Sequence, residues 1–167
     1  MRRLLTLLAG LVLVVVALQS AAASSSEQRV LEFDTMAPVM GPFVGNAHPI
    51  RGVNGGGLPW QIAEGRGDLT TNGQLDVEVR GLVLLDAAPV PEDLRGINPI
   101  PTFRAIVSCL TIVNGNAATR NVVTGPFPAT RAGDSEIRAT IGLPNPCFAP
   151  IIFVGPNATT WFAVTGR

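Results

Sequence analysis

Apolar and polar residues alternate along several short segments of the chain, a pattern typical of strands with one buried face. Turn signals rich in Asn, Gly and Pro separate these segments, and no stretch has a helical period of useful length. The pattern predicts an all-β fold, an antiparallel β-sandwich or a partly open barrel of about seven to nine short strands. The predicted strands are Arg29–Phe33, Leu58–Leu69, Gln74–Leu85, Thr102–Val113, Asn121–Val123, Glu136–Ile141, Ile151–Val154 and Thr160–Val164, with one helical turn in Pro89–Leu94.

The segment Thr102–Val113 is apolar on both faces apart from Arg104, so we expect it to be the central strand. Residues 36–57 are rich in Gly and Pro and predict a long surface loop, which makes 24–57 a largely irregular N-terminal segment. No repeat or linker divides the remaining chain. A single domain is therefore expected over residues 24–167.

The first 23 residues have the pattern of a secretory signal peptide. Arg2 and Arg3 precede the apolar run Leu4–Leu18, and Ala21-Ala22-Ala23 is a small-residue cleavage signal. The protein is therefore expected to be secreted or held in the cell envelope, with no membrane span after cleavage. The alternative is that the run stays as an anchor, although it is shorter than the roughly 20 residues that a span needs.

Export also bears on the two cysteines, Cys109 and Cys147. An exported chain with two cysteines most often pairs them, so we predict one disulfide. Neither cysteine belongs to a C-x-x-C pair, which argues against a redox site.

A hairpin is predicted around Thr71-Asn72-Gly73, read as a three-residue loop with Gly73 in the left-handed conformation. This register puts apolar residues opposite each other and makes two opposite-charge pairs, whereas a two-residue loop would lose the match. Asp68 opposite Asp76 is its one unfavourable pair. The predicted pairs are Leu69 with Leu75, Arg66 with Glu78, and Glu64 with Arg80.

The same stretch contains two candidate binding motifs. Arg66-Gly67-Asp68 is the tripeptide of integrin ligands, but the predicted register puts it on a solvated strand face and not at a loop tip. Asp68, Asn72 and Asp76 fall at spacings used in calcium loops, but the last position of an EF-hand would be Val79 and the flanks are strands. Only a weak calcium contact from Asp68, Asn72 and Asp76 remains as a hypothesis.

Three aromatic residues, Trp60, Trp161 and Phe162, allow two interpretations. Large aromatic side chains usually fill the core. The alternative is that they line a groove for a sugar or another ligand with an apolar face.

Candidate catalytic groups are few. Gly133-Asp134-Ser135 resembles an esterase nucleophile segment, but the only histidine, His48, lies far upstream in the predicted loop, and a turn is the simpler interpretation. One histidine cannot build a multi-histidine metal site. We therefore predict no catalytic residues and no cofactor.

Net charge excludes one class of partner. Loss of Arg2 and Arg3 would leave 10 arginines against 12 acidic residues, a net charge of about −2, and the chain has no lysine. Such a chain has no basic field for nucleic acid.

A resemblance is carried by five longer segments: Gly55–Trp60, Leu75–Leu84, Asn98–Leu110, Leu143–Val154 and Trp161–Gly166. They resemble a group of small exported actinobacterial-type proteins of unassigned function. The resemblance covers most of the chain after residue 23, implies a secreted single-domain β protein, and carries no functional residues. A looser likeness, in Gly73–Leu82, is to β-sandwich domains related to chordin repeats and copper/zinc superoxide dismutase, whose metal-binding histidines are missing here.

The sequence thus favours a non-catalytic structural or interaction protein that acts outside the cytoplasmic membrane, with an envelope protein or a polysaccharide as its partner. The main alternative is an extracellular ligand-binding module for sugar or calcium, and the third is a hydrolase.

Overall fold

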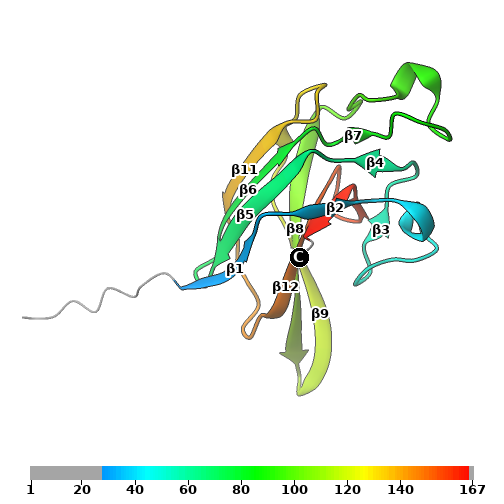
Figure 1. The fold of residues 1–167 in the computed structure, drawn as a ribbon. Helices are drawn as coiled ribbons and strands as arrows, with labels where there is room; N and C mark the ends of the chain where they lie inside the picture. Colours follow the sequence, from blue (N-terminus) through cyan, green and yellow to red (C-terminus); the bar gives the residue numbers. More distant parts are fainter. Residues whose placement is uncertain (1–27, 166–167) are drawn as a thin grey trace, which may run out of the picture.

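The computed structural model describes residues 28–165, and their regular secondary structure is almost entirely β-strand (Figure 1). The predicted leader over residues 1–23 lies outside this part of the chain. Two short 3-10 turns, η1 (Gly41–Phe43) and η2 (Glu92–Leu94), interrupt the strands. The strands are β1 (Arg29–Phe33), β2 (Met36–Pro38), β3 (Asn54–Gly55), β4 (Trp60–Gln61), β5 (Glu64–Thr70), β6 (Gln74–Arg80), β7 (Val83–Leu84), β8 (Thr102–Val113), β9 (Asn116–Val123), β10 (Phe127–Pro128), β11 (Ser135–Thr140), β12 (Phe148–Gly155), β13 (Thr160–Trp161) and β14 (Ala163–Thr165).

Two antiparallel sheets form a sandwich, which confirms the predicted fold class. The four-stranded sheet has the order β1-β5-β6-β11. The six-stranded sheet has the order β10-β8-β12-β14-β2, and β9 also pairs with β8. Val77 and Ile137 of the first sheet and Val107 and Ile152 of the second are all fully buried. The hydrophobic alternation read from the sequence therefore marks the faces that meet in the core.

The predicted strands are found with shifted ends. β1 and β8 have the predicted bounds, and β8 has partners on both sides, as expected for a central strand. The predicted strands 58–69 and 74–85 are each broken into two, because the chain leaves the four-stranded sheet to form the small pair β4–β7. β9 begins five residues earlier than predicted.

The β5–β6 hairpin has the predicted register. Arg66 lies opposite Glu78 and Leu69 opposite Leu75, and Gly73 has a φ of 84°. Asp68 and Asp76 also face each other, as the sequence indicated. β11 brings Arg138 opposite Asp76 on its other side, with 2.9 Å between Nε and Oδ2, so a cation offsets the repulsion of the two carboxylates.

The N-terminal segment is more ordered than predicted. Within residues 28–57, the part of it that the structure describes, lie β1, β2, η1 and β3. Its residues 39–57, which we call the covering segment, pack on the six-stranded sheet and bury Val39 and Val53 completely. Most of these residues lie outside strands, but the surface loop expected over 36–57 did not foresee the burial of Val39 and Val53, in a segment that gains backbone partners from strands distant in sequence.

Candidate interaction surface

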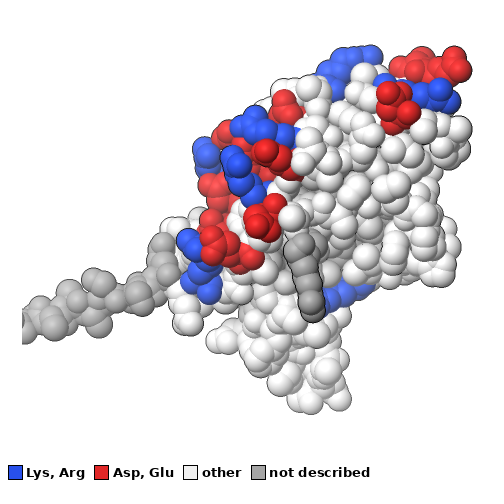
Figure 2. All heavy atoms as spheres, viewed as in Figure 1, with Lys and Arg blue, Asp and Glu red and all other residues white. Residues whose placement is uncertain are grey.

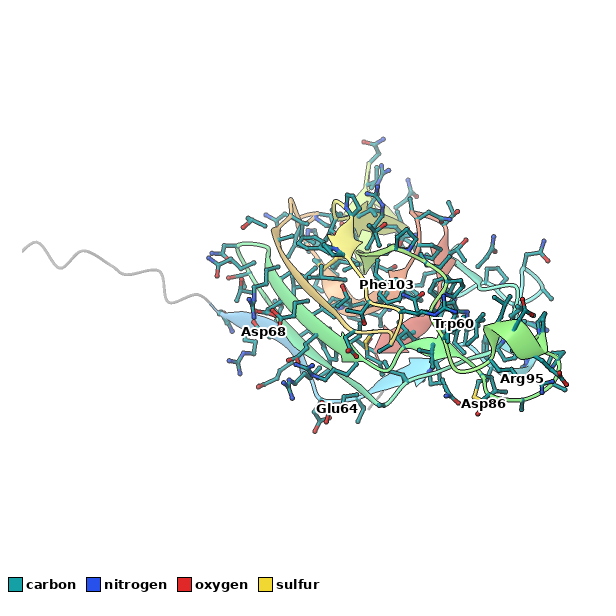
Figure 3. All side chains as sticks on the ribbon, turned by 90° about the horizontal axis from the view of Figure 1, so that it is seen from above. Trp60, Glu64, Asp68, Asp86, Arg95 and Phe103 are labelled. Atoms are coloured by element: carbon teal, nitrogen blue, oxygen red, sulfur yellow. A yellow bond between two sulfur atoms is a disulfide. The ribbon has the colours of Figure 1, made fainter. Side chains whose placement is uncertain are left out.

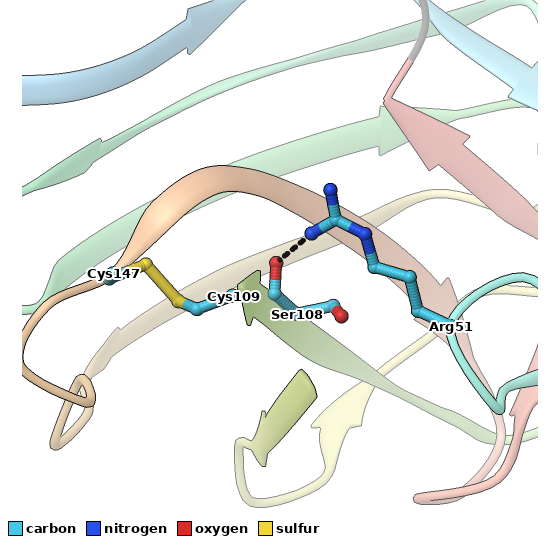
Figure 4. The surroundings of a disulfide bond; sticks show 4 residues. All are labelled: Arg51, Ser108, Cys109 and Cys147. Carbon is cyan, nitrogen blue, oxygen red and sulfur yellow. Dashed lines mark hydrogen bonds between the residues drawn. A yellow bond between two sulfur atoms is a disulfide. The ribbon is translucent and has the colours of Figure 1, made fainter. Parts of the chain in front are cut away.

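The predicted disulfide is present. Cys109 in β8 and Cys147, just before β12, are bonded, with 5.0 Å between their Cα atoms (Figure 4). Phe148 follows Cys147 directly and lies opposite Leu110. The bridge therefore joins β8 to β12 at the point where β8 continues into its hairpin with β9.

The aromatic residues Trp60, Trp161 and Phe162 do not line an open groove. They are 2%, 2% and 5% exposed. Trp60 stacks on Phe162 with 3.8 Å between ring centroids, and both rings meet Phe103 edge-on. Figure 3 shows Trp60 and Phe103 within the body of the molecule. These side chains are core residues, because the covering segment and the loops above β8 close over them.

Of the three residues of the calcium hypothesis, Asp68 and Asp76 lie in strands and Asn72 lies in the turn between them. Asp68 and Asp76 lie on the outer face of the four-stranded sheet, and Asp76 is paired with Arg138. Asn72 is in the turn, where its Oδ1 accepts hydrogen bonds from the Thr70 hydroxyl and, at 3.3 Å, from the Gln74 amide. Within residues 28–165, no group of three or more His, Cys, Asp or Glu side chains could hold a metal ion.

The other motifs are structural. Arg66 of the Arg-Gly-Asp tripeptide lies in β5 and donates to Glu78 at 2.5 Å, so the tripeptide is a strand segment and not a loop tip. In the Gly133-Asp134-Ser135 segment, the Ser135 hydroxyl is buried and donates to the Pro128 carbonyl at 2.9 Å. The Asp134 carboxylate accepts a hydrogen bond from the backbone amide of Gly81, 53 residues away, so it ties two loops together. His48 is exposed.

Charged residues are divided very unevenly between the two sheets. The strands of the four-stranded sheet carry six acidic residues and four arginines, whereas those of the six-stranded sheet carry two arginines and no acid. Figure 2 shows the charges gathered over the four-stranded sheet and the upper loop, while most of the remaining visible surface is uncharged. Ion pairs link many of the charges on the first sheet, among them Arg66–Glu78, Arg80–Glu78 and Arg138–Asp76.

An apolar surface stands at the opposite end of the molecule. The distal part of β8 and β9 form a hairpin that extends beyond the sandwich (Figure 1), which we call the projecting hairpin, residues 110–119. Leu110, Ile112 and Phe148 are 42%, 55% and 56% exposed. Leu110 and Ile112 alternate along β8 and Phe148 is opposite Leu110, so all three side chains share one face. We call these three residues the apolar strip.

The apolar strip continues a face that is covered elsewhere. The covering segment contacts β8 at Ser108, two residues before Leu110. There the Arg51 guanidinium donates to the Ser108 carbonyl at 2.8 Å (Figure 4). The Asn121 amide, opposite Ser108, donates to the Arg51 carbonyl at 3.1 Å. The covering segment therefore contacts β8 next to the apolar strip, and no described segment covers Leu110 and Ile112.

Two arginines lie near this surface, Arg51 beside it in the covering segment and Arg120 on the opposite face of β9. Burial lowers the pKa of the Arg51 guanidinium, and Arg120 on β9 is exposed. Neither makes an ion pair with an acidic residue of the described chain. The surface around the apolar strip therefore has cationic groups and no anionic ones.

Sequence reasoning did not find the apolar strip. Because Thr102–Val113 is apolar on both faces, it was expected to be the central strand, and the exposure of Leu110 and Ile112 depends on which segments pack over one of those faces. One signal was available: the partner strand, NAATRNVV, has no large apolar residue before Val122, which is unusual beside the core of a sandwich.

Comparisons with protein-family models, with curated proteins and with solved structures found no match. The described residues contain no helix that is long and apolar enough to cross a membrane. The surface itself is therefore the basis for proposing a function.

Proposed function

We propose that this chain is an exported, non-catalytic interaction module that binds a partner protein of the envelope or extracellular space through the apolar strip. The observation that carries the proposal is that Leu110 and Ile112 of the projecting hairpin gather with Phe148 of β12 on one exposed face. Scattered apolar residues on a surface need no explanation, but a contiguous group on a projecting element is typical of an interaction site.

The energy available from the strip fits a reversible contact. Complete burial of a Leu, Ile or Phe side chain stabilises by about 1.5–3 kcal/mol. Each side chain of the strip is about half exposed, so covering all three would contribute about 2–4 kcal/mol in total. That contribution alone gives weak binding, and polar contacts at the rim must add to it.

The disulfide supports the same proposal. It fixes β8 to β12 at the base of the hairpin, so Leu110 and Phe148 are held side by side before a partner arrives. A surface that is ordered in advance loses less conformational entropy on binding. A disulfide of this kind is also typical of proteins that work in oxidising compartments, which agrees with the predicted leader.

The proposal is tested by photo-crosslinking from defined positions. A benzophenone side chain at position 112 is compared with one at position 140, where Thr140 is exposed on the four-stranded sheet. Each variant is exported by the organism that encodes the chain and irradiated in the culture. We expect one discrete heterologous adduct from position 112 and none from position 140.

Two results would contradict the proposal. Equal labelling from both positions would show that the hairpin has no special role, and no adduct from position 112 would show that it is not a contact surface. The mass of the adduct also identifies self-association, since a species of twice the monomer mass would assign the strip to a second copy of this chain.

A further inference from the structure

The edge of β9 is open. β9 pairs with β8 over Asn116–Val123, and no other strand of residues 28–165 pairs with it. An edge strand presents a row of unpaired N–H and C=O groups along its outer side. The hairpin projects from the sandwich (Figure 1), and five of the eight residues of β9 are exposed, so most of this edge is accessible.

β9 also has few of the features that usually protect an edge strand. Natural edges are kept from pairing by Pro, by several charged residues or by very short length. β9 has eight residues, no Pro and no acidic residue, and Arg120 is its one charged residue. Its length is ample for the recognition of an extended peptide by strand addition.

Side chains along β9 define what a strand added there would meet. Thr119 lies opposite Leu110 and Ala117 opposite Ile112, so these two small residues share a face with the apolar strip. Adjacent strands are about 4.8 Å apart, so a large side chain on the added strand can lean across Ala117 toward Ile112. Arg120 projects from the other face, and an acidic residue opposite it would form a cross-strand ion pair.

From this geometry we propose that β9 receives an extended segment of the partner as an additional antiparallel strand, with an acidic residue opposite Arg120 and large apolar residues opposite Thr119 and Ala117. The inference rests on the proposed function and adds the chemistry of the partner segment. Read from its N-terminus, that segment has an acidic residue, then a large apolar residue, then any residue, then a second large apolar residue.

Charge argues against a second copy of this chain as the occupant. β9 has Arg120 but no acidic residue, so pairing β9 with its own copy would supply no carboxylate to balance Arg120. A segment that carries a carboxylate instead balances Arg120. The observations therefore favour a heterologous acidic and apolar segment.

The experiment is an NMR titration of the exported, disulfide-bonded protein, labelled with ¹⁵N. The probe is the peptide acetyl-Thr-Glu-Leu-Thr-Phe-Thr-amide, which places Glu opposite Arg120, Leu opposite Thr119 and Phe opposite Ala117. We expect amide shifts along β9 and at Leu110 and Ile112, together with slower amide exchange in β9. A probe that is N-methylated at both Glu and Leu keeps the side chains but loses backbone donors, so we expect it to bind at least tenfold more weakly.

A charge exchange tests the ion pair. A second probe has Lys in place of Glu, and we expect the native protein to bind it about fivefold more weakly. In the Arg120→Glu variant this preference should reverse. Arg131→Glu is the matched control, because Arg131 is an exposed arginine outside the hairpin, and there the native preference should remain.

Several results would overturn the inference. Absence of shifts at millimolar probe, or shifts outside the hairpin, would show that β9 is not a receiving edge. Equal binding of the N-methylated probe would show contact without strand addition, and sedimentation of the protein alone as a dimer would assign the edge to a second copy. If the probe fails while crosslinking from position 112 succeeds, the strand-addition inference is wrong and the proposed function stands.

Discussion

Removal of the Cys109–Cys147 disulfide is expected to destabilise the fold and loosen the projecting hairpin. The two cysteines are 38 residues apart in sequence. In the chain-entropy model, a closed loop of that length lowers the entropy of the unfolded chain by an amount worth about 3.9 kcal/mol at 25 °C. Domains of this size have stabilities of about 5–15 kcal/mol, so the bridge would supply a large share of the total.

The assay is equilibrium unfolding in urea of the oxidised protein, the reduced protein and the Cys109→Ala/Cys147→Ala variant. With a denaturant slope of about 2 kcal/mol per molar, the expected loss lowers the urea midpoint by about 2 M. The reduced protein keeps both sulfur atoms, so comparing it with the variant separates the loss of the bond from the loss of buried side-chain volume at Cys109.

Hydrogen exchange then tests whether the bridge braces the hairpin. We expect amide protection in residues 110–119 to fall more than protection in β5 and β6, which the disulfide does not join. An unchanged midpoint would refute the entropic argument. A lower midpoint with uniform loss of protection would refute the bracing role and weaken the case for a surface ordered in advance.

Three further predictions concern the sandwich itself. Hydrogen bonds and the charge of two neighbouring arginines lower the pKa of Glu78. The stability that its carboxylate contributes is therefore present above the ordinary Glu range and is lost as pH falls through the depressed pKa. The native and Glu78→Gln proteins should differ in urea midpoint at pH 7 and converge at strongly acidic pH. Gly133→Ala should lower the free energy of unfolding by more than about 1 kcal/mol, because Gly133 has a φ of 85° and an added Cβ would lie 2.3 Å from a backbone oxygen. Gly125→Ala is the control, because its added Cβ meets nothing within 4 Å, and it should leave the thermal midpoint unchanged. Phe162→Ala should lower the free energy of unfolding by about 3–5 kcal/mol, since it removes the ring stacked on Trp60, and a native-like midpoint would contradict the assignment of these aromatics to the core.

The β5–β6 hairpin was predictable down to its register because the information is local. Its two strands are joined by three residues, and their alternation admits one pairing that matches both apolar and charged positions. The longest strand, β8, was predictable for a similar reason, since it is apolar on both faces. The disulfide followed from having two cysteines in a chain with a leader pattern.

Other features depend on segments distant in sequence. The sequence left Trp161 open to two interpretations, because the local pattern around an aromatic residue does not indicate whether its side chain faces solvent or the core. Its burial comes from Phe43 in the covering segment and Phe153 in β12, more than a hundred residues apart. No local pattern specifies that meeting.

The sequence by itself determined an all-β sandwich, its central strand, one hairpin register and the disulfide, because alternation, turn residues and cysteine pairing act over short distances or on few candidates. The tertiary structure alone decided which apolar side chains are covered. Leu110 and Ile112 lie on the same face of β8 as buried Ile106, and they differ because the covering segment reaches that face at Ser108 and no described segment lies over them. Exposure is a property of what packs on a residue, so the apolar strip and the open edge of β9 emerged only when the distant parts of the chain were placed together.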